Sequence, residues 1–99
     1  MTFDRINVAY FQSKKGVVHL FATEGKKYIT DTTIDELIQQ TDPKKSYRAN
    51  RQYIVSFDSI RTTHRYHKGK LLVELILSTE EQIVISMKKA GSFKKWIGY

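Results

Sequence analysis

The stretch around which the chain is organised is YRANRQYIVS, residues 47–56. Its first half holds the polar side chains Arg48, Asn50 and Arg51, and its second half is a β-forming run that begins at Tyr53. Arg and Asn carry paired hydrogen-bonding groups that match the edges of guanine and adenine, and Arg also binds phosphate in a bidentate manner. The stretch is therefore interpreted either as a recognition element held on a strand or as a plain polar turn in front of one.

The alternation of side chains limits where this strand begins. A continuous strand from Tyr47 would place Arg51 on the same side as Tyr53 and Val55. A charged side chain on that apolar side would be costly to bury. We therefore expect the strand to begin near Gln52, with Asn50 and Arg51 on a preceding turn.

Three short strands are expected before this stretch, at residues 5–12, 17–22 and 27–30. Alternation places Ile6, Val8 and Tyr10 on one side of the first strand. The turn between the first two strands carries Lys14 and Lys15.

The period then changes to that of a short helix, residues 33–41, whose apolar spacing includes Ile34 and Leu37. Thr33 and Glu36 form a capping box, and the Asp-Pro pair at residues 42–43 ends the helix. So short a helix needs a sheet to pack on. The carboxylates in its first turn suit the helix dipole, and no chemistry is assigned to them.

The second half of the chain predicts more strands and a closing helix. Strands are expected at residues 61–66, 71–77 and 83–86, the middle one central because it is almost entirely apolar. Ser86 is the expected N-cap of the last helix. One apolar stripe is expected along that helix, formed by Met87, Ala90, Phe93 and Ile97. The pattern predicts a domain dominated by β-strands, with few helical turns.

Two lysines, Lys88 and Lys89, lie in the first turn of this helix, where positive charge opposes the helix dipole. A phosphate bound at the helix start would relieve that conflict by using the free backbone N–H groups and the lysines together. The alternative is a solvated basic face.

The charge of the chain favours an acidic partner. Its 99 residues suggest one domain with a net charge of +7, of which residues 1–50 contribute +2 and residues 51–99 contribute +5. Nucleic acid is the first partner to consider, and an anionic membrane surface is the second. Cysteine is absent, and neither a membrane span nor a signal peptide is evident, so a cytoplasmic protein is expected.

Signals for an enzyme are weak, and we expect no catalysis, cofactor or metal. The five glycines are scattered, so the sequence has no glycine-rich phosphate loop. His64 and His67 have no carboxylate pair nearby, and the carboxylates at residues 80–81 are explained as solvated turn residues. The aromatic side chains form no paired stacking platform, which favours duplex over single-stranded nucleic acid.

An ordered set of motifs covers nearly the whole chain. Residues 47–55 have the order aromatic-Arg-x-Asn-Arg-Gln-aromatic-aliphatic-aliphatic. Weaker matches are the strand at residues 6–11, the helix start at 33–37, Asp-Ser-Ile at 58–60 and the Ile-Val-Ile-Ser run before Lys88. With these motifs the chain, residues 1–99, resembles the LytTR DNA-binding domain. Two departures are the missing N-terminal hairpin and the lysine at position 88, where the family often has arginine.

This resemblance implies a mostly β fold, an elongated stack of short antiparallel β-sheets with one short helix mid-chain and a C-terminal helix. It implies the output domain of a bacterial response regulator in a two-component system. Dimerisation through a receiver domain absent from these residues is a further expectation. Such domains read successive major grooves of double-stranded DNA with loop side chains.

The expected DNA-binding residues come from three segments. Asn50 and Arg51 are expected to read base edges, and Arg48 to orient them or to contact the backbone. Phosphates or rim bases are expected to be held by Lys14, Lys15, Lys88 and Lys89. The alternative is a basic β-rich module that docks on a protein or a membrane without reading DNA sequence.

Overall fold

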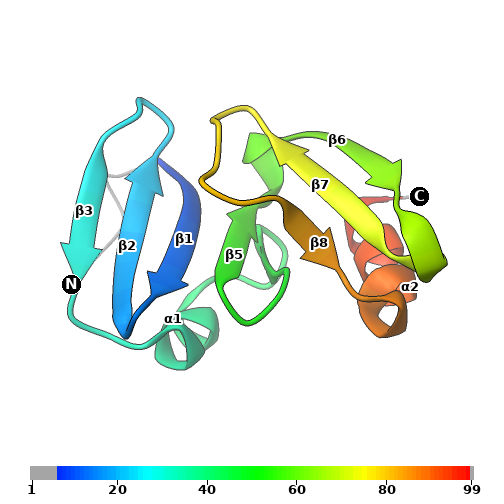
Figure 1. Ribbon diagram of the computed structural model, residues 1–99. Helices are drawn as coiled ribbons and strands as arrows, with labels where there is room; N and C mark the ends of the chain where they lie inside the picture. Colours follow the sequence, from blue (N-terminus) through cyan, green and yellow to red (C-terminus); the bar gives the residue numbers. More distant parts are fainter. Residues whose placement is uncertain (1–6, 99) are drawn as a thin grey trace.

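The computed structural model describes residues 7–98, which form eight strands and two α-helices (Figure 1). The strands are β1 (Val8–Lys14), β2 (Val17–Ala22), β3 (Lys27–Thr30), β4 (Ser46–Arg48), β5 (Tyr53–Ser56), β6 (Ile60–Arg65), β7 (Leu71–Leu75) and β8 (Ile83–Ile85). The helices are α1 (Ile34–Gln40) and α2 (Met87–Ile97), and single 3-10 turns are η1 (Phe57–Ser59) and η2 (His67–Gly69).

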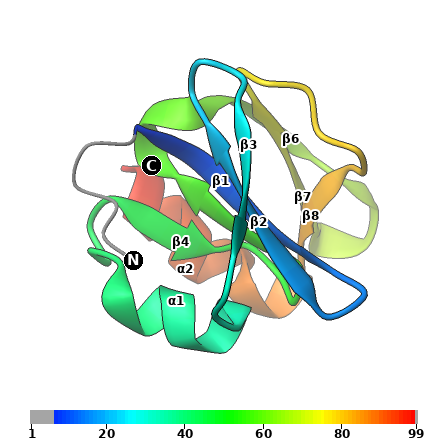
Figure 2. The same ribbon diagram turned by 90° about the vertical axis from the view of Figure 1, so that its left-hand side faces the viewer.

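The strands form two antiparallel sheets. The first sheet has the order β3-β2-β1-β5-β4, and the second has the order β6-β7-β8. Figures 1 and 2 show α1 beside the first sheet and α2 behind the second, in a body of 37 × 27 × 24 Å. The expected mostly β fold, a stack of short antiparallel sheets with one short mid-chain helix and a C-terminal helix, is confirmed.

Strand β5 connects two hydrophobic cores because its alternate side chains are buried on opposite faces. Ile54 packs on one face of the first sheet, in the cluster that contains Leu37 of α1. Tyr53 and Val55 pack on the other face, in the cluster that contains the second sheet and Phe93 of α2. Fully burying each aliphatic or aromatic side chain contributes roughly 1.5–3 kcal/mol. This strand therefore determines how the two halves of the molecule are joined.

The first strand departs from the expected alternation. Val8 packs in the cluster with α1, whereas Tyr10 faces the second sheet. The register of β1 against β2 shifts between these two residues, so both Ala9 and Tyr10 face the second sheet. The prediction that Val8 and Tyr10 share one side is wrong because a bulge interrupts the alternation. Ile6 lies outside the described residues.

The polar stretch forms the turn of a hairpin. Strand β5 begins at Tyr53, and Asn50 and Arg51 lie on the turn before it, as expected. Strand β4, which was not expected, pairs with β5 through Tyr47 opposite Val55. This strand is a three-residue edge strand whose side chains are all half-buried, so it carries no alternation that a sequence pattern can detect.

Both helices are capped as expected. The Thr33 hydroxyl accepts a hydrogen bond from the Glu36 N–H at 3.2 Å, and the Ser86 hydroxyl accepts one from the Lys89 N–H at 3.4 Å. In α2, Ala90 and Phe93 are buried, but Met87 is 68% exposed. Met87, which the spacing assigns to the same apolar stripe, is exposed because this first helical residue lies over Gly69 of η2 rather than over a sheet.

Strand β7 is central in its sheet, as its apolar sequence predicts. It ends at Leu75 rather than at Leu77, and Ile76 is exposed. Leu77 still packs against the core, so apolar composition alone does not show where the strand ends.

We predict that Tyr10 makes the stability of the fold sensitive to alkaline pH. Its ring stacks on Phe21 at 4.4 Å between centroids, and burial, followed by the nearby Tyr53, raises the pKa of Tyr10 to about 12. The neutral form is favoured in the folded state, so this contribution is complete below pH ~10 and is lost as pH rises towards 12. Across this range the wild type should lose about 1–2 kcal/mol more than Tyr10→Phe, once solvent screening is allowed for. Urea unfolding of both proteins between pH 8 and 12 tests this, and equal losses would contradict it.

Candidate nucleic-acid interface

Three cationic segments lie along one edge of the molecule. Figure 1 shows the β1–β2 turn, the turn that leads into β5 and the start of α2 along its lower edge. These segments carry Lys14 and Lys15, then Arg51, then Lys88. The structure thus places the segments that the sequence singled out along one edge of the two-sheet fold.

The turn of residues 49–52 is held by the side-chain amide of Asn50. Its Oδ1 accepts hydrogen bonds from the Gln52 N–H at 2.8 Å and the Tyr53 N–H at 3.1 Å. Its Nδ2 donates to the Val84 carbonyl of the second sheet at 3.3 Å. Asn50 therefore shapes the turn and ties it across the two sheets, using both ends of its amide.

Arg48 braces the same turn from the other side. Its Nε donates a hydrogen bond to the Asn50 carbonyl at 3.3 Å, and its Nη2 donates one to the Arg51 carbonyl at 3.4 Å. Its Nη1 forms an ion pair with Asp35 of α1. The Asp35 carboxylate, which the sequence pattern explained by the helix dipole alone, also orients this arginine.

Arg51 projects from the braced turn. Its side chain is exposed, and its guanidinium has no hydrogen bond or ion pair to any residue in the range 7–98. The adjoining backbone is fixed, since the Gln52 carbonyl accepts a hydrogen bond from the Ser13 N–H at 2.7 Å. Arg51 therefore presents a guanidinium without a partner in the described part of the chain, from a turn whose backbone is hydrogen-bonded.

The two lysines at the start of α2 are placed differently. The Lys89 Nζ donates to the Arg48 carbonyl at 2.9 Å and lies 5.7 Å from the centre of the Tyr47 ring. Burial, followed by the charge of Arg48, lowers the pKa of Lys89. Lys88 is exposed, and its side chain is without a partner among the described residues. Their position in the sequence did not distinguish these two roles.

The β1–β2 turn also has one engaged and one free lysine. Lys14 forms an ion pair with Glu80, and this hydrogen bond raises the pKa of Lys14 and lowers that of Glu80. The Gln12 Nε2 donates to the same carboxylate at 3.4 Å. The interpretation of Glu80 as a solvated turn residue is thus incomplete. Lys15, at φ 51°, is exposed and, within residues 7–98, unpaired.

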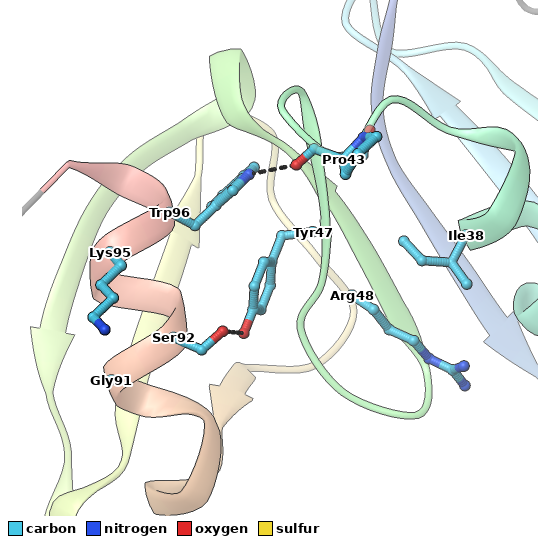
Figure 3. Close-up of a pocket in the computed structure, with 9 residues that line it drawn as sticks. Ile38, Pro43, Tyr47, Arg48, Gly91, Ser92, Lys95 and Trp96 are labelled. Carbon is cyan, nitrogen blue, oxygen red and sulfur yellow. Dashed lines mark hydrogen bonds between the residues drawn. The ribbon is translucent and has the colours of Figure 1, made fainter.

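Aromatic contacts fasten α2 to β4 (Figure 3). The Tyr47 hydroxyl and the Ser92 Oγ are 2.8 Å apart and share a hydrogen bond, and the Trp96 Nε1 donates to the Pro43 carbonyl at 2.9 Å. The Tyr47 ring packs against Trp96 and Phe93 at 5.1 and 5.3 Å between centroids. Tyr47, Ser92 and Trp96 border an open groove of about 810 Å³ between α1 and α2. These contacts pack α2 against β4 and the loop that precedes it.

A smaller hollow of about 500 Å³ lies between the β4–β5 turn and the start of α2. Its lining includes the polar side chains of Arg48, Asn50, Arg51, Lys70, Ser86 and Lys89. Sequence reasoning missed Lys70, which follows the tight turn η2. It is brought here by the pairing of β7 with β8, in which Leu71 opposes Ile85, and no local signal in the sequence reports that register.

Comparison with known proteins finds a matching family and a similar fold. Residues 2–98 match the family model described as the LytTr DNA-binding domain. A solved LytTr DNA-binding domain from a methyl-accepting/DNA response regulator of Bacillus cereus has a similar fold, with a TM-score of 0.80. The two chains are 19% identical, and the match covers 94% of this chain and 83% of the other. Among the described residues, no helix is both long and apolar enough to span a bilayer.

We predict that Asn50 acts through the shape of the turn. Asn50→Ala leaves the N–H groups of Gln52 and Tyr53 without their acceptor and should lower the free energy of unfolding by about 1–3 kcal/mol. Asn50→Asp keeps that acceptor and should lower it less. Arg51→Ala, the control in the same turn, should change it by no more than about 0.5 kcal/mol. Urea denaturation measures all three, and equal effects of Asn50→Ala and Arg51→Ala would contradict the prediction.

Proposed function

The chain belongs to the LytTr DNA-binding domain family, and from this premise we propose that it binds double-stranded DNA in a sequence-specific manner. Side chains from the β1–β2 turn, the β4–β5 turn and the start of α2 enter successive major grooves. This is a family of DNA-binding domains rather than of enzymes, and the protein acts by binding alone.

The free guanidinium of Arg51 is the observation that carries this proposal. Arginine recognises guanine through two parallel hydrogen bonds to O6 and N7, and each such pair discriminates against a wrong base by about 1–3 kcal/mol. A side chain that is already hydrogen-bonded within the protein would first have to break those contacts. Arg51 has none to break within residues 7–98, and Asn50 and Arg48 immobilise the backbone that carries it. The backbone that carries Arg51 is therefore held in place before DNA binds.

The remaining site residues fall into two groups, according to whether their side chains already have a partner within the protein. We assign Lys15 and Lys88, which are exposed and unpaired among the described residues, to phosphate contacts. Lys14 and Lys89 already have internal partners: the charge of Lys14 is offset by Glu80, whereas Lys89, which donates to a carbonyl, adds to the local positive potential. Asn50 is expected to contact a base only at the rim of the turn, because its amide is used to hold that turn.

In its cellular setting, the domain serves as the output domain of a bacterial transcription regulator in a two-component system. The cytoplasm is the compartment where such a protein meets its DNA. Pairing of two chains through a receiver domain would place two copies on repeated half-sites. The net charge of +7 suits DNA binding because it attracts the phosphate backbone from a distance.

Selection from random duplexes tests sequence-specific binding directly. A recovered motif supports the proposal, and the spacing of any repeats within it reports the pairing of chains. Recovery of sequences without a common motif would overturn the proposal. It would favour instead a basic module that docks on proteins or membranes.

Arg51→Ala should weaken binding to the selected motif by about 1–3 kcal/mol and relax the preference at one base pair. The control is Lys26→Ala, which removes a charge from the β2–β3 turn at the opposite edge of the molecule (Figure 1). Fluorescence anisotropy with single-substituted duplexes measures both effects. Unchanged base preference in Arg51→Ala would remove this residue from base reading.

Lys88→Ala should weaken binding to all duplexes to the same extent. The loss of one phosphate contact lowers the slope of log K against log salt by about 0.9. Anisotropy titrations between 50 and 300 mM salt compare this variant with wild type and with Lys26→Ala. A slope equal to that of wild type would exclude Lys88 from the phosphate contacts.

A further inference from the structure

We propose that the hollow between the β4–β5 turn and the start of α2 binds one phosphate group of the DNA backbone. The positive charge that contacts this phosphate comes mainly from Lys70. This inference rests on the DNA-binding function proposed above. It adds a fourth contact segment, the residue after η2, to the three that the sequence indicated.

The fold brings Lys70 to this hollow. The turn η2 closes with a hydrogen bond from the Lys70 N–H to the His67 carbonyl at 3.3 Å, and the Tyr66 N–H donates to the Lys70 carbonyl at 2.9 Å. Strand β7 starts at the next residue, and Leu71 opposes Ile85 of β8. Lys70 therefore lies beside Ser86, the N-cap of α2. Its ammonium group has no hydrogen bond or ion pair with another described residue.

The charges around the hollow are unbalanced. Four cationic side chains line it, from Arg48, Arg51, Lys70 and Lys89, and no carboxylate is among its lining residues. Arg48 and Lys89 are near enough for the charge of one to lower the pKa of the other. A bound anion would relieve this repulsion, and the hollow of about 500 Å³ is open to solvent.

The start of α2 contributes a favourable dipole. Its first-turn N–H groups point out of the helix, and the positive end of the helix dipole favours an anion there. The Ser86 hydroxyl already accepts from the Lys89 N–H, which leaves its own proton available to donate.

The internal bonds of the lining residues single out Lys70 as the residue that decides binding. Arg48 donates to two carbonyls and pairs with Asp35, and Lys89 donates to the Arg48 carbonyl. These two cations are committed to the protein. Arg51 is free but is directed by the proposed function to a base. Lys70 is the remaining lining cation, and its phosphate lies next to the base pair that Arg51 reads.

The chain offers a matched control for this lysine. Lys68 is in η2, two residues away, is exposed and does not line the hollow. Its φ of 58° is one that asparagine tolerates, so Lys68→Asn removes one charge without straining the turn. Lys70→Gln removes one charge from the hollow, and Lys70→Arg keeps it.

The first measurement is the salt dependence of binding to the duplex selected by the wild type. Lys70→Gln should lower the slope of log K against log salt by about 0.9, weaken binding about 3–10-fold at 150 mM salt and leave the selected motif unchanged. Lys70→Arg should retain the wild-type slope. Lys68→Asn should change the slope by less than half as much as Lys70→Gln. Equal slopes for Lys70→Gln and Lys68→Asn would overturn the proposal.

The second measurement locates the phosphate. Single neutral methylphosphonates are placed along each strand of the selected duplex, and the affinity of each duplex is measured. Wild type should lose affinity at one position adjacent to the base pair affected by Arg51→Ala, and Lys70→Gln should no longer respond there. An unchanged response in Lys70→Gln would remove Lys70 from the hollow's ligand set while leaving the function of Arg51 intact. Failure of wild type to select any motif would reject the proposed function, and this site with it.

Discussion

The amide of Asn50 is the contact on which the arrangement of the interface depends. It bonds to two N–H groups of its own turn and to the Val84 carbonyl in the other sheet, so one side chain both shapes the turn and relates the two sheets. Backbone N–H groups need hydrogen-bond partners, and in this turn a side chain supplies them. The free arginine next to it owes its position to this network. A base-reading side chain on a loop that moved would lose affinity to the entropy of ordering that loop.

The interface also shows why counting cations does not identify a binding surface. Lys14 is paired with Glu80, Arg48 with Asp35, and Lys89 donates to a carbonyl, so each of these charges already has a partner or a structural task. An internal partner must be displaced or shared before such a group can bind phosphate. By contrast, the cations of this edge that are unpaired among the described residues need to give up only water and counterions when they bind DNA. Release of those counterions is what favours binding to a polyanion.

Local sequence patterns predicted most of the elements because their causes are local. The alternation in β2, the capping residues Thr33 and Ser86, and the polar turn before Tyr53 each depend on neighbours within a few residues. The pattern failed where a distant partner decides the outcome. Strand β4 exists because β5 offers it hydrogen bonds, and Met87 is exposed because η2, rather than a sheet, lies beneath it. The bulge that separates Val8 from Tyr10 likewise depends on how β1 pairs with β2.

The amino-acid sequence by itself determined which segments of this protein are polar turns, which are buried strands, and where its positive charge is concentrated. It also carried enough ordered motifs to identify the family. Only the tertiary structure decided which cations are free, because an ion pair such as that between Lys14 and Glu80 joins residues 66 positions apart. It alone placed Lys70 in the hollow that Arg51 also lines, through the register of β7 and β8. Distances between segments that are remote in the chain depend on packing, and no periodicity of the sequence encodes them.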